Sequence, residues 1–358
     1  MTGHRTAAHW FIPSGCEYVH LPSWDTLFAS KATYWGREPF WACSRQEALG
    51  LRTEILRGIV RGFRPDALVV DHLPLGAEGE LADILESTPC RKYLVTRGVQ
   101  NETEDLQRLI FGGEAHASLV KHYDRILAAI DPRVFDFGHR YSLPPEVVGK
   151  VLHTGYVTEP IGPDVIVRTR AERGLRPHAV WVVASAGGGQ RGEALIKACL
   201  ALASQHEEIV FDIVMGPRSA LPWHRTTETL VDEGAVRLHR ETGSMPLFNA
   251  SADIVISSGG YNTTLEALQG NARILCFPYR TDERDEQVQH AKYLKPFVDL
   301  EVSTDLGELP ALFSHVLARV RTSVPADDRR LLDLRGAPRI AEIVLEDLAS
   351  ALQPGGVP

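Results

Sequence analysis

Short apolar runs alternate with longer helical patterns along most of this 358-residue chain. This alternation favours parallel strands, each joined to the next by a helix. In the first half, it predicts strands over residues 67–71, 93–96, 125–129 and 151–154, and helices that include residues 44–62 and 102–111. The chain is therefore expected to have an α/β fold built on mostly parallel sheets.

A break near residues 159–163, which include two prolines and a glycine, interrupts the pattern and predicts a linker. The pattern then restarts, with predicted strands over residues 179–184, 209–215, 235–239, 253–257 and 273–277, and helices over 193–203, 246–250, 306–320 and 337–351. We therefore predict two Rossmann-like, doubly wound domains that face a cleft. They span residues 1–158 and 159–335, and residues 336–358 form a C-terminal helix and tail.

Composition narrows the class of protein. The chain is 44% apolar and 23% charged, and its formal net charge of −8 disfavours nucleic-acid binding, which needs a basic surface. No apolar run is long enough to span a bilayer, and residues 1–10 lack the apolar core of a signal peptide. The five cysteines lie far apart, so we expect reduced thiols, no zinc site and a cytoplasmic protein. Cys199 and Cys276, in apolar runs, are predicted core residues.

The most informative motif follows the predicted strand 253–257. Ser258, Gly259 and Gly260 form a turn, Asn262 and Thr263 begin a helix, and Glu266 lies one turn further on. Backbone N–H groups at such a turn and helix start suit a diphosphate, and the carboxylate suits a ribose diol. Alternatively, Thr263 and Glu266 form only a helix capping box, and the glycines only let the chain turn.

Three further loops follow predicted strands and are expected at the same sheet edge, where α/β proteins bind ligands. Glu286 and Gln287 are expected in a loop after the strand 273–277. Gly187, Gly188 and Gly189 form a second phosphate candidate, although the full dinucleotide-binding spacing is absent. The loop around Thr242 either reads a nucleobase through its backbone or is a plain connection.

In the first half, His72 and Arg97 each follow a predicted strand and are expected to face the cleft from the other side. An imidazole titrates near neutrality, so His72 is the candidate general base. A loop histidine that hydrogen-bonds locally is the simpler interpretation of the same residue. Arg97 would pair either with an anionic group or with a neighbouring carboxylate.

These motifs together resemble the family-28-type glycosyltransferases of the GT-B fold. Residues 258–263 with Glu266, then Glu286-Gln287 and Ala291, are similar to the C-terminal half of this family, which includes the bacterial lipid-intermediate N-acetylglucosaminyltransferase. The similarity is closer to a bacterial group of predicted glycosyltransferases. It extends through Asp71, the segment 155–157 and the segment 336–341, and so covers nearly the whole chain.

The resemblance implies inverting transfer of a sugar from a nucleotide sugar, usually UDP-linked, without an obligatory metal or other cofactor. It places Glu266 at the ribose, Gly260, Asn262 and Thr263 at the diphosphate, and the backbone near Thr242 at the base. It places Glu286 and Gln287 at the donor sugar. The Gly187–Gly189 loop would face the diphosphate or the acceptor.

The N-terminus departs from the family pattern. Met1-Thr2-Gly3 resembles the end of the second strand of the family, so one opening strand–helix unit, which often supplies the base, is expected to be absent.

The resemblance thus implies a hexosyltransferase, and we expect it to move a hexose or N-acetylhexosamine to a hydroxyl of a small-molecule acceptor. The alternatives are a nucleotide-sugar epimerase of the same shape and a non-catalytic donor-binding or partner subunit.

Overall fold

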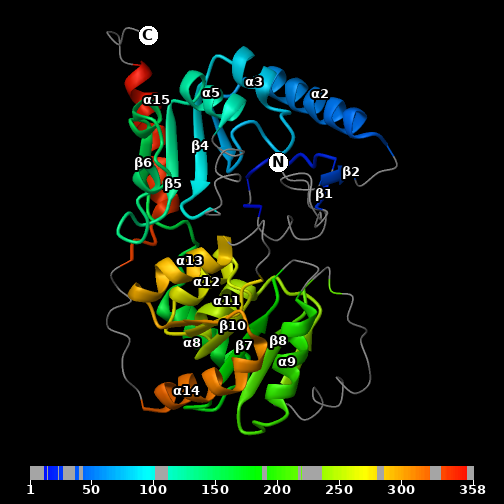
Figure 1. Cartoon of the computed structure of the whole chain (residues 1–358), viewed down its shortest axis with the longest axis vertical. Coiled ribbons are helices and arrows are strands. Elements are labelled where there is room, and N and C mark those ends of the chain that lie inside the picture. Colours follow the sequence, from blue (N-terminus) through cyan, green and yellow to red (C-terminus); the bar gives the residue numbers. More distant parts are fainter. Residues whose placement is uncertain are drawn as a thin grey trace. The chain divides into compact units, whose positions relative to one another are not determined.

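The computed structural model describes residues 12–13, 15–22, 24–26, 37–39, 43–100, 112–187, 192–216, 219, 236–279, 286–322 and 332–352. Its contacts divide the chain into two compact units (Figure 1). Unit 1 comprises Met1–Gly155 and Gly336–Pro358, and unit 2 comprises Tyr156–Arg335. No helix in the described ranges is long and apolar enough to cross a membrane.

Unit 1 contains a four-stranded parallel sheet in the order β3-β4-β5-β6. The strands are β3 (Ala67–Asp71), β4 (Arg91–Arg97), β5 (Arg125–Ala129) and β6 (Val151–His153). The helices are α2 (Arg45–Phe63), α3 (Ala82–Ser87), α5 (Gly113–Lys121), α6 (Phe137–Arg140), α7 (Pro145–Val148) and α15 (Gly336–Leu352), and β1 (Trp24–Thr26) pairs antiparallel with β2 (Arg37–Pro39). All four predicted strands are confirmed, whereas the predicted helix 102–111 lies outside the described residues.

Local sequence signals explain how α2 begins and ends. Ser44 and Glu47 form a reciprocal capping box at its start, and Arg64 closes it in the left-handed conformation at φ 49°. The buried Arg52 side chain on this helix donates two hydrogen bonds to Glu80, one of them at 2.6 Å. A buried charge needs such a partner, and this pair ties α2 to the loop before α3.

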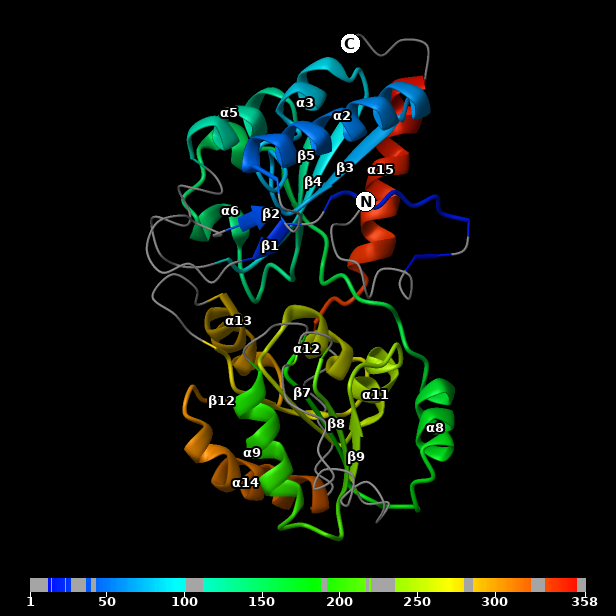
Figure 2. The same ribbon diagram turned by 90° about the vertical axis from the view of Figure 1, so that its right-hand side faces the viewer.

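The C-terminal helix α15 belongs to unit 1, although 180 residues of unit 2 separate it from the rest of that unit in sequence (Figure 2). Asp347 on α15 accepts hydrogen bonds from Tyr93 on β4 and from Arg125 on β5, both at 3.3 Å. We predicted residues 336–358 as a C-terminal segment separate from both domains, but their helix α15 is part of unit 1.

Unit 2 contains a six-stranded parallel sheet in the order β12-β11-β10-β7-β8-β9. The strands are β7 (Trp181–Ser185), β8 (Val210–Val214), β9 (Val236–His239), β10 (Ile254–Ser257), β11 (Arg273–Cys276) and β12 (Leu300–Val302). The helices are α8 (Pro163–Glu172), α9 (Glu193–Ala203), α11 (Met245–Ser251), α12 (Tyr261–Leu268), α13 (Glu286–Leu294) and α14 (Leu309–Arg321), with short 3₁₀ turns at Lys295–Phe297 and Leu306–Glu308. The sequence pattern misses β12 because three residues are too few to show a period.

The predicted linker needs a correction at both ends. Tyr156 already belongs to unit 2, where its N–H donates to the Asp333 carbonyl at 2.7 Å, and Val157 bridges to Arg335. Pro163 is the first residue of α8, a favoured position for proline because its missing N–H has no partner there. The prolines and glycine near residue 160 therefore mark a helix start as much as a break.

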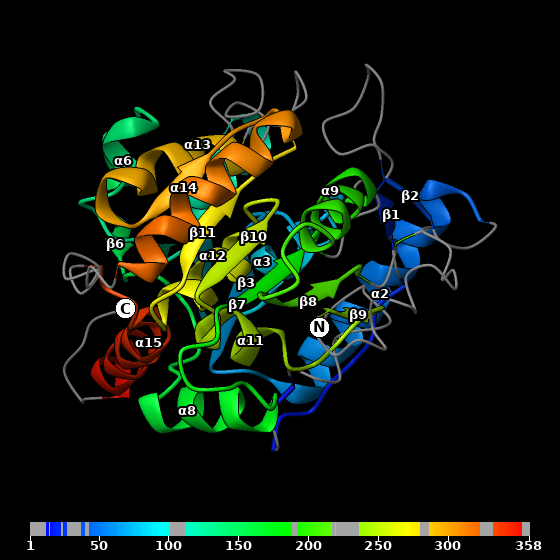
Figure 3. The same ribbon diagram turned by 90° about the horizontal axis from the view of Figure 1, so that it is seen from below.

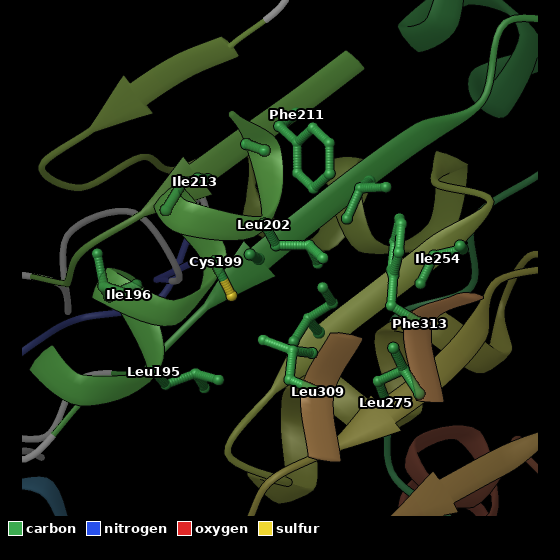
Figure 4. Packing of buried hydrophobic residues seen from close by; sticks show 14 of the residues in the cluster. Leu195, Ile196, Cys199, Leu202, Phe211, Ile213, Ile254, Leu275, Leu309 and Phe313 are labelled. Carbon is green, nitrogen blue, oxygen red and sulfur yellow. The ribbon is translucent and has the colours of Figure 1, made fainter. Parts of the chain in front are cut away.

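Apolar residues from the sheet and from the helices α9 and α14 form the core of unit 2. In Figure 4, Leu195, Cys199 and Leu202 of α9 and Leu309 and Phe313 of α14 pack over the sheet strands. Figure 3 shows α9 and α14 on one face of the sheet and α8 and α11 on the other. Because both faces are covered, β7 and β10 are buried at every position, as parallel strands usually are. Cys199 and Cys276 are both buried, as predicted.

The order of strands creates a switch point between β7 and β10. The chain leaves β7 towards β8 on one side, and it leaves β10 towards β11 on the other. Loops that leave a parallel sheet in opposite directions open a crevice at the carboxyl ends of the two strands, where ligands bind. The predicted class, α/β with two Rossmann-like sheets, is confirmed.

Candidate functional site

Two matching turns follow the neighbouring strands β7 and β10. Ser185 and Ser257 end the strands and are register partners. The Gly187 N–H donates to the Ser185 hydroxyl and the Gly259 N–H to the Ser257 hydroxyl, each at 3.1 Å. Both glycines have positive φ, 71° and 76°. The Ser258 hydroxyl also donates to the Ala186 carbonyl at 3.4 Å, which links the two turns.

Gly259 is required by space as well as by conformation. A Cβ atom at this position would lie 2.3 Å from the Cys276 sulfur at the end of β11. Gly260 differs, because the nearest atom to its hypothetical Cβ, the Thr263 hydroxyl oxygen, is 3.9 Å away. The turn therefore depends on Gly259, whereas Gly260 tolerates a side chain. Gly188 and Gly189 lie outside the described residues.

The capping-box interpretation of the next helix is wrong. Gly260 is the N-cap of α12, no side chain caps it, and the Thr264 N–H bonds to the Gly260 carbonyl at 3.0 Å. Thr263 is thus already inside the first turn, where its side chain does not cap the helix. A helix start without a side-chain cap retains N–H donors for an anion. Asn262 is exposed and Thr263 half-buried at this start.

Glu266 occupies a half-buried position behind that helix start. Asn249 is a fully buried residue on α11, and its amide nitrogen Nδ2 donates to Oε2 of Glu266 at 2.8 Å. Burial raises the pKa of the Glu266 carboxyl, and the hydrogen bond from Asn249 only partly opposes this effect. A fixed, desolvated carboxylate close to a helix start that follows a sheet strand is typical of a binding site. The sequence did not suggest Asn249, because its contact with Glu266 depends on the packing of two helices.

Glu286 and Gln287 form the first turn of α13, so the prediction that they lie in a loop is wrong. The buried residues Val288, Ala291 and Leu294 recur at helical spacing and hold this helix on the unit. The α13 helix nevertheless brings Gln287 to the predicted edge: its Cβ is 3.9 Å from the position that a Gly259 Cβ would occupy. His290 on the same helix stacks on Tyr261 of α12, with ring centroids 5.5 Å apart.

The loop around Thr242 is ordered by its own side chain. The Thr242 hydroxyl accepts a hydrogen bond from the Ser244 N–H at 3.1 Å, immediately before α11. Thr242 is half-buried. The loop leads into the helix that carries Asn249, so the predicted base contact and the Glu266 partner lie on consecutive segments.

A buried polar network that the sequence pattern did not indicate lies next to the Thr242 loop. Asp212 on β8 is fully buried and accepts hydrogen bonds from the Trp181 indole at 2.8 Å and from Arg173. The His239 Nε2 lies 2.6 Å from its other carboxyl oxygen. Burial raises the pKa of Asp212, but hydrogen bonds from His239 and Arg173 outweigh it, so the pKa lies below its ordinary value. The one sequence signal for this network is Asp212 itself, an aspartate inside the otherwise apolar strand β8.

His239 ends β9 and retains about a quarter of its side-chain surface. Phe248 of α11 packs edge-on against both Trp181 and His239, with ring centroids 5.4 and 5.8 Å apart. The network therefore fixes the orientation of an imidazole at the carboxyl edge of the sheet, next to the Thr242 loop.

In unit 1, His72 follows β3 and adopts a left-handed conformation at φ 66°. Its Nδ1 lies 3.2 Å from the Gln100 amide nitrogen. An amide nitrogen only donates, so Nδ1 accepts and the proton of a neutral ring is at Nε2. The local hydrogen bond that the simpler interpretation required is therefore present. Arg97 and Asp71 are both exposed, at the ends of β4 and β3. Partial desolvation by the surrounding protein raises the pKa of the Asp71 carboxyl, and Arg97 lowers it by a smaller amount.

Residues 182–302 match the sequence profile of the glycosyltransferase family 28 C-terminal domain. Unit 2 is a family 28 glycosyltransferase domain. The match spans the strands β7 to β12 and therefore includes both serine–glycine turns, Glu266 and Gln287. No curated protein sequence matches the chain.

Solved structures with similar folds extend the comparison to both units. MurG of Acinetobacter baumannii is 13% identical, with 86% of this chain and 83% of that chain covered and a TM-score of 0.53. The spinosyn rhamnosyltransferase SpnG is 17% identical, with 84% and 78% covered and a TM-score of 0.53. The UDP-GlcNAc 2-epimerase of Neisseria meningitidis is 13% identical, with 86% and 82% covered and a TM-score of 0.54. The family 28 domain therefore belongs to a chain with the GT-B fold.

Proposed function

We propose that this chain is an inverting, UDP-sugar-dependent glycosyltransferase that moves a hexose or N-acetylhexosamine to a hydroxyl of a small-molecule acceptor. The observation that carries the proposal is the edge of the family 28 domain. There, two serine–glycine turns, an uncapped helix start and an anchored carboxylate follow two neighbouring strands. No metal ion or other cofactor takes part in the proposed reaction.

The proposed roles follow from these positions. The N–H groups around Gly260 and Thr263 bind the diphosphate and stabilise charge on the leaving group as the sugar departs. Glu266 binds the ribose hydroxyls, and Asn249 fixes the orientation of its carboxylate. Gln287, beside the Gly259 turn, contacts the sugar together with Glu286.

The base in unit 1 has two candidates. His72 can accept a proton only after its neutral ring moves its hydrogen from Nε2, because Gln100 already occupies Nδ1. Asp71, next to it, is exposed, and partial desolvation raises the pKa of its carboxyl, with Arg97 opposing. We propose that one of these two removes the acceptor proton. A loss of transfer in His72→Gln but not in Asp71→Asn, with UDP affinity unchanged in both, assigns the base to His72; the reverse assigns it to Asp71.

Calorimetry of the full chain with UDP, UDP-hexoses and thymidine diphosphate tests the donor site. Thymidine diphosphate is included because it is bound in a SpnG structure. We expect UDP to bind, and Glu266→Ala to weaken it roughly tenfold or more through the loss of charged hydrogen bonds. Unchanged affinity in a folded Glu266→Ala variant would show that Glu266 does not hold the ribose.

The epimerase alternative has an observation in its favour, because a UDP-GlcNAc 2-epimerase shares the fold. Incubation of the chain with UDP-GlcNAc, followed by product analysis, separates the possibilities. Transfer releases UDP only when an acceptor hydroxyl is present, epimerisation yields an isomeric UDP-sugar without an acceptor, and a donor-binding subunit yields neither product. Dialysis against EDTA should leave transfer unchanged.

A further inference from the structure

A cavity of about 1210 Å³ lies in unit 1, away from the residues that the proposed reaction uses. Arg91 begins β4, and Asp66 and Asp124 immediately precede β3 and β5, so the cavity lies at the amino ends of these strands. At the opposite, carboxyl ends, His72 follows β3 and Arg97 is the last residue of β4. The seven residues of β4 separate the two ends by about 20 Å. The cavity is therefore distinct from the proposed acceptor edge.

The side chains that line this cavity carry a net positive charge, although the chain as a whole carries a net charge of −8. Four arginines line it, namely Arg57, Arg61, Arg64 and Arg91, against the two carboxylates Asp66 and Asp124. The excess of two positive charges among the lining side chains favours an anion.

Two of the four arginines are already engaged. Arg57 donates to Asp83 at 3.1 Å and also pairs with Glu54, and Arg91 donates to Asp124 at 2.7 Å. The exposed side chains of Arg61 and Arg64 make no hydrogen bond or ion pair with any residue in the described ranges. Arg61 lies in the last turn of α2, and Arg64 is the residue that closes this helix. Two guanidinium groups thus remain available at one side of the cavity.

The remaining wall is mostly apolar, although Ser87 and Thr88 also line it. It includes Val60 of α2, the buried Ile84 of α3 and Leu348 of α15. Sites for small organic molecules combine a mostly apolar wall with a few polar groups that fix orientation. A bare inorganic anion would leave this wall unused, whereas an anion that carries a hydrocarbon group would cover it.

We propose that this cavity binds a phosphate monoester that carries an apolar group, with the phosphate on Arg61 and Arg64 and the apolar group against Val60, Ile84 and Leu348. A phosphate monoester carries close to two negative charges at neutral pH, which matches two unengaged guanidinium groups. Guanidinium groups bind phosphate through paired N–H···O hydrogen bonds.

Calorimetry of the full chain with hexyl phosphate tests this site, with inorganic phosphate and hexanoate as comparison ligands. Saturating UDP is present throughout, so that the proposed diphosphate site is filled. We expect hexyl phosphate to bind more tightly than either comparison ligand. Equal binding of hexyl phosphate and inorganic phosphate would contradict a role for the apolar wall, and tighter binding of hexanoate would contradict a phosphate site.

Variants then locate the binding. Arg61→Ala and Arg64→Asn should each weaken hexyl phosphate about tenfold or more, because each removes hydrogen bonds to a charged group. Asparagine suits position 64 because it tolerates the left-handed conformation. Leu348→Asn should weaken hexyl phosphate but not inorganic phosphate. Arg168→Ala, which removes an exposed arginine on α8, is the matched control and should leave the affinity unchanged.

Two results would overturn the proposal: full affinity in Arg61→Ala and Arg64→Asn, or an equal loss in Arg168→Ala, which would indicate nonspecific attraction. Both arginines are exposed, so their replacement should leave the chain folded, and Arg61→Lys should retain part of the affinity. If UDP does not bind, the same titrations without UDP still test the cavity through its arginines. Failure of the donor proposal is thereby separated from failure of this one.

Discussion

Replacement of Gly259 by alanine tests the turn that precedes the proposed diphosphate donors. The new Cβ would lie 2.3 Å from the Cys276 sulfur, which is fully buried and has little room to move. The residue would also retain a φ of 76°, a region that side chains other than glycine rarely adopt. Two separate costs are therefore expected from one methyl group.

Their sizes follow from typical values. A left-handed conformation costs a residue with a Cβ about 1–2 kcal/mol, and overpacking of a filled interior costs about 1–3 kcal/mol. Gly259→Ala should therefore lower the free energy of unfolding by roughly 2–5 kcal/mol. Gly260→Ala is the control, because its φ of −58° is ordinary and its nearest neighbour is 3.9 Å away. It should cost less than about 1 kcal/mol.

A double-mutant cycle separates the two costs. Cys276→Ala removes the sulfur that the new methyl would meet. In the Gly259→Ala background, it should therefore recover the stability lost through overpacking, whereas the stability lost through the left-handed conformation should remain lost. The coupling energy should be about 1–3 kcal/mol. Urea unfolding of the full chain measures the total, and hydrogen exchange of peptides from residues 254–268 assigns the change to this turn. Equal stability of the two glycine variants, or a coupling energy near zero, would refute the reasoning.

Further predictions concern the titratable network and the donor sugar. Because burial raises the pKa of Glu266, the native protein should gain stability as the pH falls through that raised value towards 4.5, and urea unfolding of Glu266→Gln across pH should not show this gain. The effect of Asp212 on stability has the opposite sign. Because its pKa is lowered from 3.8, the ionised carboxylate stabilises the fold above pH 3.8, and this contribution is lost as the pH falls further. The free energy of unfolding should therefore fall less steeply at acidic pH in Asp212→Asn than in the original chain. Gln287→Ala should weaken the intact UDP-sugar much more than UDP in calorimetry, and a parallel fall in both affinities would contradict a contact with the sugar.

The sequence predicted those parts of the fold that depend on local pattern. Buried parallel strands such as β5 and β10 are continuous apolar runs, and their limits follow from the polar residues that flank them. Glu286 and Gln287 were assigned to a loop because the polar first turn of a helix has the same composition as a loop. The stacking of His290 on Tyr261 and the approach of Gln287 to the Gly259 turn arise only after folding.

The site was predictable only where one segment carries it. Gly259, Thr263 and Glu266 lie within eight residues of each other, so their spacing indicated a shared role. The Asn249 partner of Glu266 and the Asp212–His239 pair join separate elements, and the second pair spans 27 positions. No periodicity records such pairs, because packing of helices and strands brings them together.

The position of α15 in unit 1 has a consequence for synthesis on the ribosome. Asp347, which bonds to Arg125, is 222 positions further along the chain, whereas every strand of unit 2 precedes α15. At a synthesis rate of about 5–20 residues per second, Asp347 is added to the chain roughly 10–45 s after Arg125. The later half of the protein can therefore fold before the earlier half is complete. A nascent chain arrested before Gly336 should carry a protease-resistant unit 2 behind a protease-sensitive unit 1.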